Sequence, residues 1–166
     1  MNVKKSFIAS SLAVALACGG AALLTAGSSF AYDESSTAAI NVDAEQVILK
    51  GYDAVSYFQG KPAMGEKRFA AEHDGVTYYF ASAANMKTFQ SDAAHYAPQF
   101  GGFCAMGAAL GKKLDVDPQS YKLVDDKLYL SVNADVFKKW SEDVPGNVAK
   151  ANANWPTIKD KAPSSL

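Results

Sequence analysis

A single thiol limits how the mature form of this chain can be held together. The sequence contains two cysteines, Cys18 and Cys104, and Cys18 lies in an N-terminal segment that we expect to be removed. One cysteine cannot form an internal disulfide, so we expect a fold without this cross-link. Cys104 lies in Gly101-Gly102-Phe103-Cys104-Ala105-Met106, which combines reactive sulfur atoms with glycines more tightly than any other stretch.

The first 31 residues have the layout of a secretory signal peptide. Lys4 and Lys5 precede an apolar run from Phe7 to Leu24, and Ser29-Phe30-Ala31 places small residues at the −3 and −1 positions of a cleavage site. No stop-transfer flank follows the run, which favours removal over a retained membrane helix. The sequence therefore predicts cleavage after Ala31 and a periplasmic or secreted protein.

A lipid anchor at Cys18 is the alternative to this signal peptide. A lipoprotein would be cut just before the cysteine, but Leu16 stands one place late for the usual lipoprotein signal. The residues after Cys18 also stay apolar, where a lipoprotein normally turns polar. We therefore favour the cleaved signal peptide over the anchor.

The predicted mature chain has the size of one domain and a mildly acidic charge. Removing 31 of the 166 residues leaves 135, with 14 basic and 17 acidic side chains, because the removed segment holds two lysines and no acidic residue. A net charge of −3 offers no basic surface for nucleic acid or anionic lipid. No other stretch approaches the length of a membrane span. We expect a flexible lead-in at 32–46, one domain at 47–156 and a C-terminal tail at 157–166, without an internal repeat of convincing length.

Two hairpins give the clearest secondary-structure signals. Asp74-Gly75 lies between two runs rich in strand-forming residues and suits a type I′ turn, because both turn positions need positive φ. Asp125-Asp126-Lys127 separates a second pair of such runs. The segments that we expect to be extended are 47–49, 54–58, 68–73, 76–80, 121–124 and 128–132.

Capping residues predict short helices around these hairpins. Ser82 can cap a helix at 83–91, and Asn133 can cap one that ends near Glu142, because a side-chain oxygen satisfies a free backbone N–H of the first turn. The small residues after Gly102 predict a short helix with its C-terminal cap near Gly111, and a last helix is expected at 147–154. Hairpins mixed with three or four short helices predict an α+β fold with a small antiparallel sheet.

Cys104 is the strongest candidate for chemistry. In the first turn of its predicted helix, the partial positive charge of the helix N-terminus would lower the pKa of the thiol. A thiolate with help from Met106 or His95 would suit Cu(I), a soft ion. The alternative is a buried cysteine that packs as a small apolar side chain. The sequence does not place His95 relative to Cys104, and it leaves both interpretations open.

Aromatic residues suggest a second candidate site. Tyr52, Asp53 and Phe103 could line a pocket for a small molecule, with Asp53 supplying a carboxylate. An aspartate in a turn also commonly bonds its own backbone. A thiol-dependent enzyme would need a base beside Cys104. The sequence has no Cys-x-x-Cys pair, P-loop, Gly-x-Gly-x-x-Gly or Gly-x-Ser-x-Gly motif, and too few ligands for four-coordinate structural zinc.

Five short motifs between residues 47 and 156 carry a family resemblance. They are Gly51-Tyr52-Asp53-Ala54-Val55-Ser56-Tyr57-Phe58, Tyr78-Tyr79-Phe80-Ala81-Ser82, His95-Tyr96-Ala97-Pro98, Gly101-Gly102-Phe103-Cys104-Ala105 and Asn152-Ala153-Asn154-Trp155-Pro156. Together they resemble the YHS domain family, most closely its exported single-domain branch. The resemblance implies a small α+β module related to metal-binding domains of copper and heavy-metal transport ATPases. Where that metal-binding branch has cysteines, this chain has Ala81 and Asn85.

These observations lead to two expectations of function. The first is an exported, non-enzymatic binding module that holds a soft metal ion such as copper through Cys104, with Met106 or His95. The alternative is a metal-free module that binds a small molecule or a protein at a pocket with Tyr52, Asp53 and Phe103. A thiol-dependent enzyme is the least favoured of the three.

Overall fold

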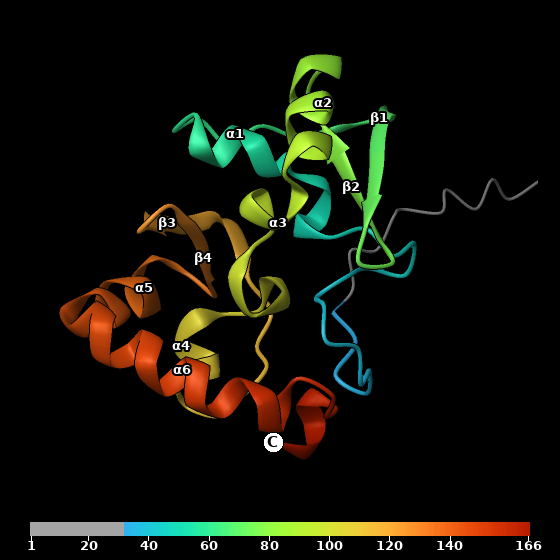
Figure 1. Ribbon diagram of the computed structural model, residues 1–166. Coiled ribbons are helices and arrows are strands. Elements are labelled where there is room, and N and C mark those ends of the chain that lie inside the picture. Colours follow the sequence, from blue (N-terminus) through green and yellow to red (C-terminus); the bar gives the residue numbers. More distant parts are fainter. Residues whose placement is uncertain (1–31) are drawn as a thin grey trace, which may run out of the picture.

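Two halves of similar build follow one another along the chain (Figure 1). The structure, a computed structural model, describes residues 32–166, so the predicted signal peptide and Cys18 lie outside the described residues. In Figure 1 the first half lies at the top and the second at the lower left, with α6 along the second half. The first half comprises η1 (Leu49–Gly51), α1 (Ala54–Phe58), β1 (Glu66–His73), β2 (Val76–Phe80) and α2 (Ala83–Ser91), and after α3 (Ala93–Tyr96) come η2 (Gln99–Gly102), α4 (Ala105–Ala109), β3 (Asp117–Val124), β4 (Lys127–Ser131), α5 (Ala134–Trp140), η3 (Ser141–Asp143), α6 (Val144–Ile158) and η4 (Pro163–Ser165).

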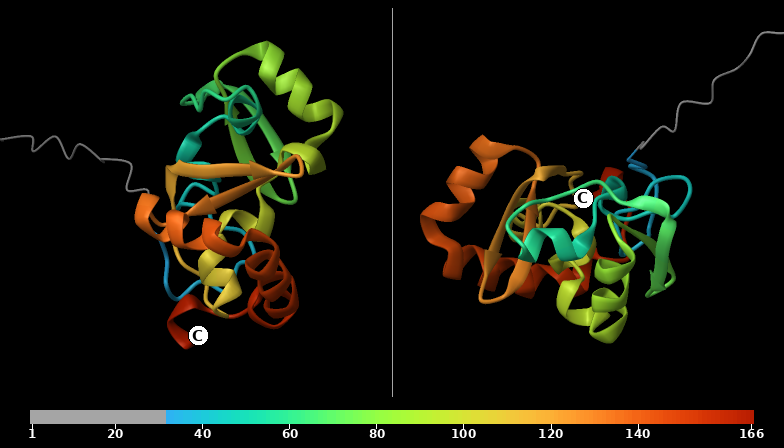
Figure 2. Two further views of the ribbon diagram at one scale, coloured as in Figure 1. Left: turned by 90° about the vertical axis from the view of Figure 1, so that its left-hand side faces the viewer. Right: turned by 90° about the horizontal axis from the view of Figure 1, so that it is seen from above.

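Both predicted hairpins are present. β1 pairs antiparallel with β2, and β3 pairs antiparallel with β4. Asp74 and Gly75 have φ values of 51° and 77°, and Asp125 and Asp126 have 49° and 60°, so both tight turns use the left-handed region. The α+β class is confirmed. The described strands form two separate two-stranded sheets rather than the single sheet that we expected (Figure 2).

The two halves contain equivalent elements at a constant sequence offset. β1 and β3 begin at residues 66 and 117, and β2 and β4 begin at 76 and 127, so each pair is offset by 51 residues. The same offset relates α1 to α4, and the start of α2 to the start of α5. Each hairpin is irregular at the same place, between Glu66 and Ala70 in one and between Asp117 and Tyr121 in the other. The expectation of no internal repeat is therefore wrong.

The same backbone turn opens each half. The three residues Leu49-Lys50-Gly51 have φ values of 57°, 51° and 82°, and Phe100-Gly101-Gly102 have 53°, 59° and 78°. Consecutive left-handed residues are rare, because the conformation crowds a side chain against the backbone. Gly101 has no room for a side chain at all, since a Cβ there would clash with the carbonyl oxygen of Ala39.

Apolar side chains from both halves share the interior. The larger buried cluster joins Tyr57, Phe80 and Phe89 of the first half to Leu128 and Leu130 of β4. A smaller cluster forms where α4 packs against α6. The side chains at this helix contact are small, which lets the two helices approach closely: Ala105, Ala108, Ala109 and Ala151 are all buried there.

Three predicted segments differ from the structure. In 47–49, expected to be extended, Leu49 instead begins η1 with a φ of 57°. Residues 54–58, which we expected to be extended, form α1, because the Asp53 side chain accepts hydrogen bonds from the backbone N–H groups of Val55 and Ser56. The last helix extends past Asn154 and Pro156 to Ile158. The Asn154 side chain donates to two backbone carbonyls at the end of α4, which ties the middle of α6 to that helix.

Residues 32–46, expected as a flexible lead-in, have defined contacts in the structure. Lys113 is only 1% exposed, and its Nζ donates to the backbone carbonyls of Ala38, Lys159 and Lys161 at 2.7, 2.9 and 2.8 Å. One ammonium group therefore ties the lead-in and the C-terminal tail to the second half. Burial lowers the pKa of Lys113, and nearby Asp160 offsets part of that effect.

We predict that Lys113→Met lowers the free energy of unfolding by about 2–4 kcal/mol, because three carbonyl oxygens lose a buried charged donor. Urea denaturation followed by circular dichroism measures this loss. Lys112→Met is the matched control, since the Lys112 side chain is exposed and donates only to the carbonyl of the C-terminal Leu166. That variant should change stability by less than about 0.5 kcal/mol. Equal losses in the two variants would contradict the clamping role of Lys113.

Candidate functional site

Cys104 is enclosed in the protein core. It is 0% exposed and belongs to the larger apolar cluster. The backbone N–H of Gly107 donates to its Sγ over 3.5 Å, and the hydroxyl of Ser131 lies 3.9 Å from the same sulfur. The thiol therefore serves as the N-terminal cap of α4, and it is not open to solvent or to a metal ion in this conformation.

Asp53 occupies the same place in the first half. Asp53 and Cys104 are separated by the repeat offset, and each caps the five-residue helix that follows it. In both halves the backbone N–H three residues after the cap donates to the cap side chain. The backbone N–H of Asp53 donates to Ala63 O at 2.9 Å, and that of Cys104 donates to Leu114 O at 3.0 Å. The equivalence favours a structural role for both residues.

The carboxylate of Asp53 is fully engaged by protein groups. Asp53 is 0% exposed, and its Oδ1 accepts from the N–H groups at the start of α1. Its Oδ2 accepts from Ala81 N at 2.9 Å and from Asn85 Nδ2 at 2.6 Å. Ala81 and Asn85 are the two positions at which the YHS resemblance implies cysteines, and here they meet at Asp53. Asp53 therefore ties α1 to the segment between β2 and α2 and does not face a pocket.

His95 does not lie beside Cys104. Its Nε2 is 3.5 Å from a carboxylate oxygen of Asp126, and its ring packs against Phe58 at 4.9 Å between centroids. Asp126 is in the turn of the second hairpin, five residues before Ser131, which contacts Cys104. Because a strand rises about 3.3 Å per residue, Asp126 and Ser131 lie about 16 Å apart along the hairpin. The structure therefore separates two members of the predicted copper site.

Met106 is the second sulfur ligand of the predicted copper site. Met106 is partly buried and packs against both apolar clusters. Within residues 32–166, no group of three or more His, Cys, Asp or Glu side chains is placed to hold a metal ion. The predicted set of Cys104, Met106 and His95 thus lacks a common centre, because the imidazole is held at the far end of the hairpin.

The aromatic members of the predicted pocket are also apart. The hydroxyl of Tyr52 accepts a hydrogen bond from Gln119 Nε2 at 3.1 Å. Phe103 is 4% exposed, and the Lys113 Nζ lies 4.9 Å from its ring centroid. Tyr52 and Phe103 hold equivalent positions in the two halves, so they face different surroundings. Of the three predicted pocket residues, Phe103 lines a cavity that the structure describes.

One cavity of the described residues is a cleft against the lead-in. It holds about 440 Å³ and is open to solvent. A much smaller cavity of about 10 Å³ adjoins it, and the two share the side chains of Tyr32, Asn41, Val42 and Asp43. The remaining residues of the larger cleft are Asp33, Ser36, Ile40, Ala44, Gln46 and Phe103. We call this larger cavity the Asp43 cleft.

Asp43 is the most unusual polar group of this cleft. It is 7% exposed, and its Oδ1 accepts from the backbone N–H groups of Glu45 and Val47 at 3.0 and 2.8 Å. Its Oδ2 is fully buried and has no hydrogen-bond partner in the protein. A buried carboxylate oxygen without a donor is costly, because it has lost its water and gained nothing in return. A bound molecule that donates to this oxygen would remove that cost.

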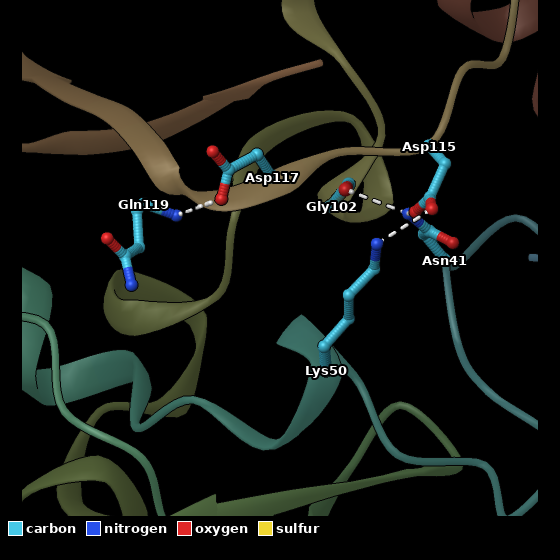
Figure 3. Close-up of polar contacts among 6 residues, drawn as sticks. All are labelled: Asn41, Lys50, Gly102, Asp115, Asp117 and Gln119. Carbon is cyan, nitrogen blue, oxygen red and sulfur yellow. Dashed lines mark hydrogen bonds and ion pairs between the residues drawn. The ribbon is translucent and has the colours of Figure 1, made fainter. Parts of the chain in front are cut away.

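An ion pair forms one wall of the small cavity and joins three parts of the chain. Lys50 Nζ lies 2.8 Å from Asp115 Oδ2, and Asn41 Nδ2 donates to Asp115 Oδ1 at 3.1 Å. Asn41 also reaches the carbonyl of Gly102 at 3.4 Å. Figure 3 shows Lys50 extending from η1 toward Asp115 and Asn41, with Gln119 and Asp117 on the other side of the view. The lead-in, the first half and the second half therefore meet at one polar cluster.

Tyr32 closes the other side of the small cavity. Its hydroxyl donates a short hydrogen bond to the Lys113 carbonyl, and its ring meets Phe103 edge to face. Burial, with Asp115 and Glu34 nearby, raises the pKa of Tyr32 to about 12. The neutral hydroxyl is thus the form that the folded protein favours.

Comparisons with family models, with curated proteins and with solved structures found no match to this chain. The resemblance to the YHS domain family therefore stays a prediction. Among the residues that the structure covers, no helix combines the length and the apolar character that crossing a membrane requires.

The sequence contains one local signal for the cleft, which the motif analysis did not include. Asp43 stands two residues before Glu45 and four before Val47, the spacing at which an aspartate accepts hydrogen bonds from the backbone ahead of it. Burial of its second oxygen depends on packing of the lead-in against distant segments, and no local pattern reports that.

We predict that Cys104 reacts slowly with 5,5′-dithiobis(2-nitrobenzoate) in native buffer and at once in urea, because the sulfur becomes accessible only when α4 opens. Absorbance of the released thiolate measures both rates. Full labelling within seconds in native buffer would show instead that the thiol is open to reagents and to metal ions.

We also predict that Tyr32 makes the protein less stable at high pH. With a folded pKa of about 12 against an ordinary 10.0, the contribution of Tyr32 is complete below pH 10. It is lost between pH 10 and 12, because the unfolded chain ionises first. Urea denaturation across this range should show a smaller decline for Tyr32→Phe than for the wild type. Identical declines would rule out this contribution.

Proposed function

We propose that this protein is an exported, non-enzymatic module that binds a small molecule in the Asp43 cleft. One observation carries the proposal: Asp43 Oδ2 is buried beside the cleft without a donor from the protein. The proposal corresponds to the metal-free alternative of the sequence analysis, with the site moved from Tyr52 and Asp53 to the lead-in. Phe103 belongs to both versions.

We favour the metal-free alternative over copper binding because it requires a smaller change in the structure. Copper binding through Cys104 would need the sulfur to leave its capping position and the apolar cluster around it. Of the two predicted helpers, His95 is held by Asp126 and Phe58, which leaves only Met106 beside the sulfur. The Asp43 cleft is already open to solvent, so a ligand can enter it, and the lining must shift only where the donor reaches the buried Oδ2 of Asp43.

The size and lining of the cleft support a small molecule as the ligand. A volume of about 440 Å³ falls within the range of about 300–1,000 Å³ that is typical of small-molecule sites. Ile40, Val42 and Phe103 supply apolar contacts, while Asn41 and Asp43 supply a few polar groups. Apolar walls with few convergent polar groups are the usual composition of such sites.

A screen of small molecules by ¹H–¹⁵N correlation spectroscopy tests this proposal. Binders should shift the amide resonances of residues 41–47 and Phe103. Ala44→Trp places a bulky ring at the cleft, keeps the Asp43 carboxylate and should abolish these shifts. Ala84→Trp on the exposed side of α2 is the matched control and should leave them unchanged. Absence of any compound that shifts these resonances in the folded wild-type protein would reject the proposal.

A further inference from the structure

We infer that the ligand of the Asp43 cleft is a small organic cation, an amine with an apolar body, whose N–H donates to Asp43 Oδ2. This inference rests on the proposed function and names the chemical class of its ligand. It starts from the charge of the cleft. The lining contains two carboxylates, Asp33 and Asp43, and none of its lining residues is lysine or arginine.

The buried oxygen of Asp43 selects for a donor. An ionised carboxylate can only accept hydrogen bonds, so its partner must bring an N–H or O–H group. A cationic donor forms a shorter and stronger bond than a neutral one, and it also balances the charge that burial has stripped of water. Asp33 adds a second negative charge at the rim, because hydrogen bonds from Ser35 hold the pKa of Asp33 below its usual range.

The positive charges near the cleft do not compete for Asp43. Lys113 lies over one face of Phe103, but three backbone carbonyls hold its ammonium group. Lys50 belongs to the adjoining small cavity and pairs with Asp115 at 2.8 Å. Both lysines are therefore engaged elsewhere.

The walls of the cleft favour a ligand with an apolar body. Ile40, Val42 and Phe103 contribute aliphatic and aromatic atoms, and Tyr32 contributes an aromatic ring. Lys113 occupies one face of Phe103, so the cationic end of the ligand is favoured at Asp43 and its apolar end along the walls. An arylalkylamine has this arrangement of charge and apolar surface.

An ordered water is the competing explanation for the orphaned oxygen. The small cavity of about 10 Å³ beside Asp43 is about the size that one water molecule needs. A water there would satisfy Oδ2 without any ligand. The experiment must therefore show that charge at Asp43 controls the binding of an amine.

Isothermal titration calorimetry with three matched probes makes this test: 2-phenylethylamine as the cation, 2-phenylethanol as the neutral analogue and phenylacetate as the anion. We expect the amine to bind at least about 10-fold more tightly than the alcohol, the effect of one charge-assisted hydrogen bond. Phenylacetate should bind most weakly, because it meets two carboxylates.

The substitution Asp43→Asn removes the charge and keeps an oxygen that can accept from Glu45 and Val47. It should weaken the amine at least about 10-fold and leave the alcohol within about 2-fold. Asp135→Asn is the matched control. It removes an exposed carboxylate that does not line the cleft and should leave amine affinity within about 2-fold. Thermal unfolding verifies that both variants remain folded.

Three results would overturn the inference. They are equal affinities of amine and alcohol for the wild type, equal effects of the two substitutions on the amine, and the absence of amine binding. If the alcohol or the carboxylate shifts residues 41–47 and the amine does not, the cation class is wrong and the small-molecule function stands. If the wider spectroscopic screen also finds no binder, the proposed function fails with it.

Discussion

Three left-handed residues at the start of each half set the course of the chain that follows. In both turns the backbone N–H of the next residue, Tyr52 or Phe103, closes onto the first carbonyl of the turn at 3.0 Å. The chain then enters a capping residue, whose own N–H pairs with a carbonyl just before the hairpin. The turn therefore fixes the helix start and the hairpin position together. The turn occurs twice, 51 residues apart, so the same local conformation positions the helix and the hairpin of each half.

The capping position shows how far two copies of one unit can diverge. Asp53 buries a carboxylate, which is tolerable because four protein donors surround it. Cys104 buries a thiol, which is a weak hydrogen-bonding group and packs among apolar neighbours. The position of Asn85, which donates to Asp53 in the first half, corresponds to Val136 in the second. The same backbone position therefore holds a polar cap with polar partners in the first half and a thiol with apolar neighbours in the second.

The sequence revealed what local chemistry decides. Asp74-Gly75 predicted its hairpin because the turn itself needs positive φ. Ser82 and Asn133 predicted their helices because their side chains accept hydrogen bonds from the first turn. The repeat stayed hidden because the halves preserve backbone conformation and exchange side chains, as at Asp53 and Cys104. The Asp43 cleft stayed hidden for another reason. It depends on where the lead-in packs, and that packing is set by residues more than fifty positions away.

The buried ammonium of Lys113 has a consequence for how the molecule can be handled. Its Nζ donates hydrogen bonds both to the carbonyl of Ala38, beside the cleft, and to the carbonyls of Lys159 and Lys161, near the end of the chain. Ser164 adds a second link by donating to the Glu34 carbonyl at 2.9 Å. The last turn of the polypeptide therefore supports the wall of the cleft, although more than one hundred residues separate them. A fusion tag, a proteolytic trim or a partner that displaces this terminus would reach the cleft by loosening its support.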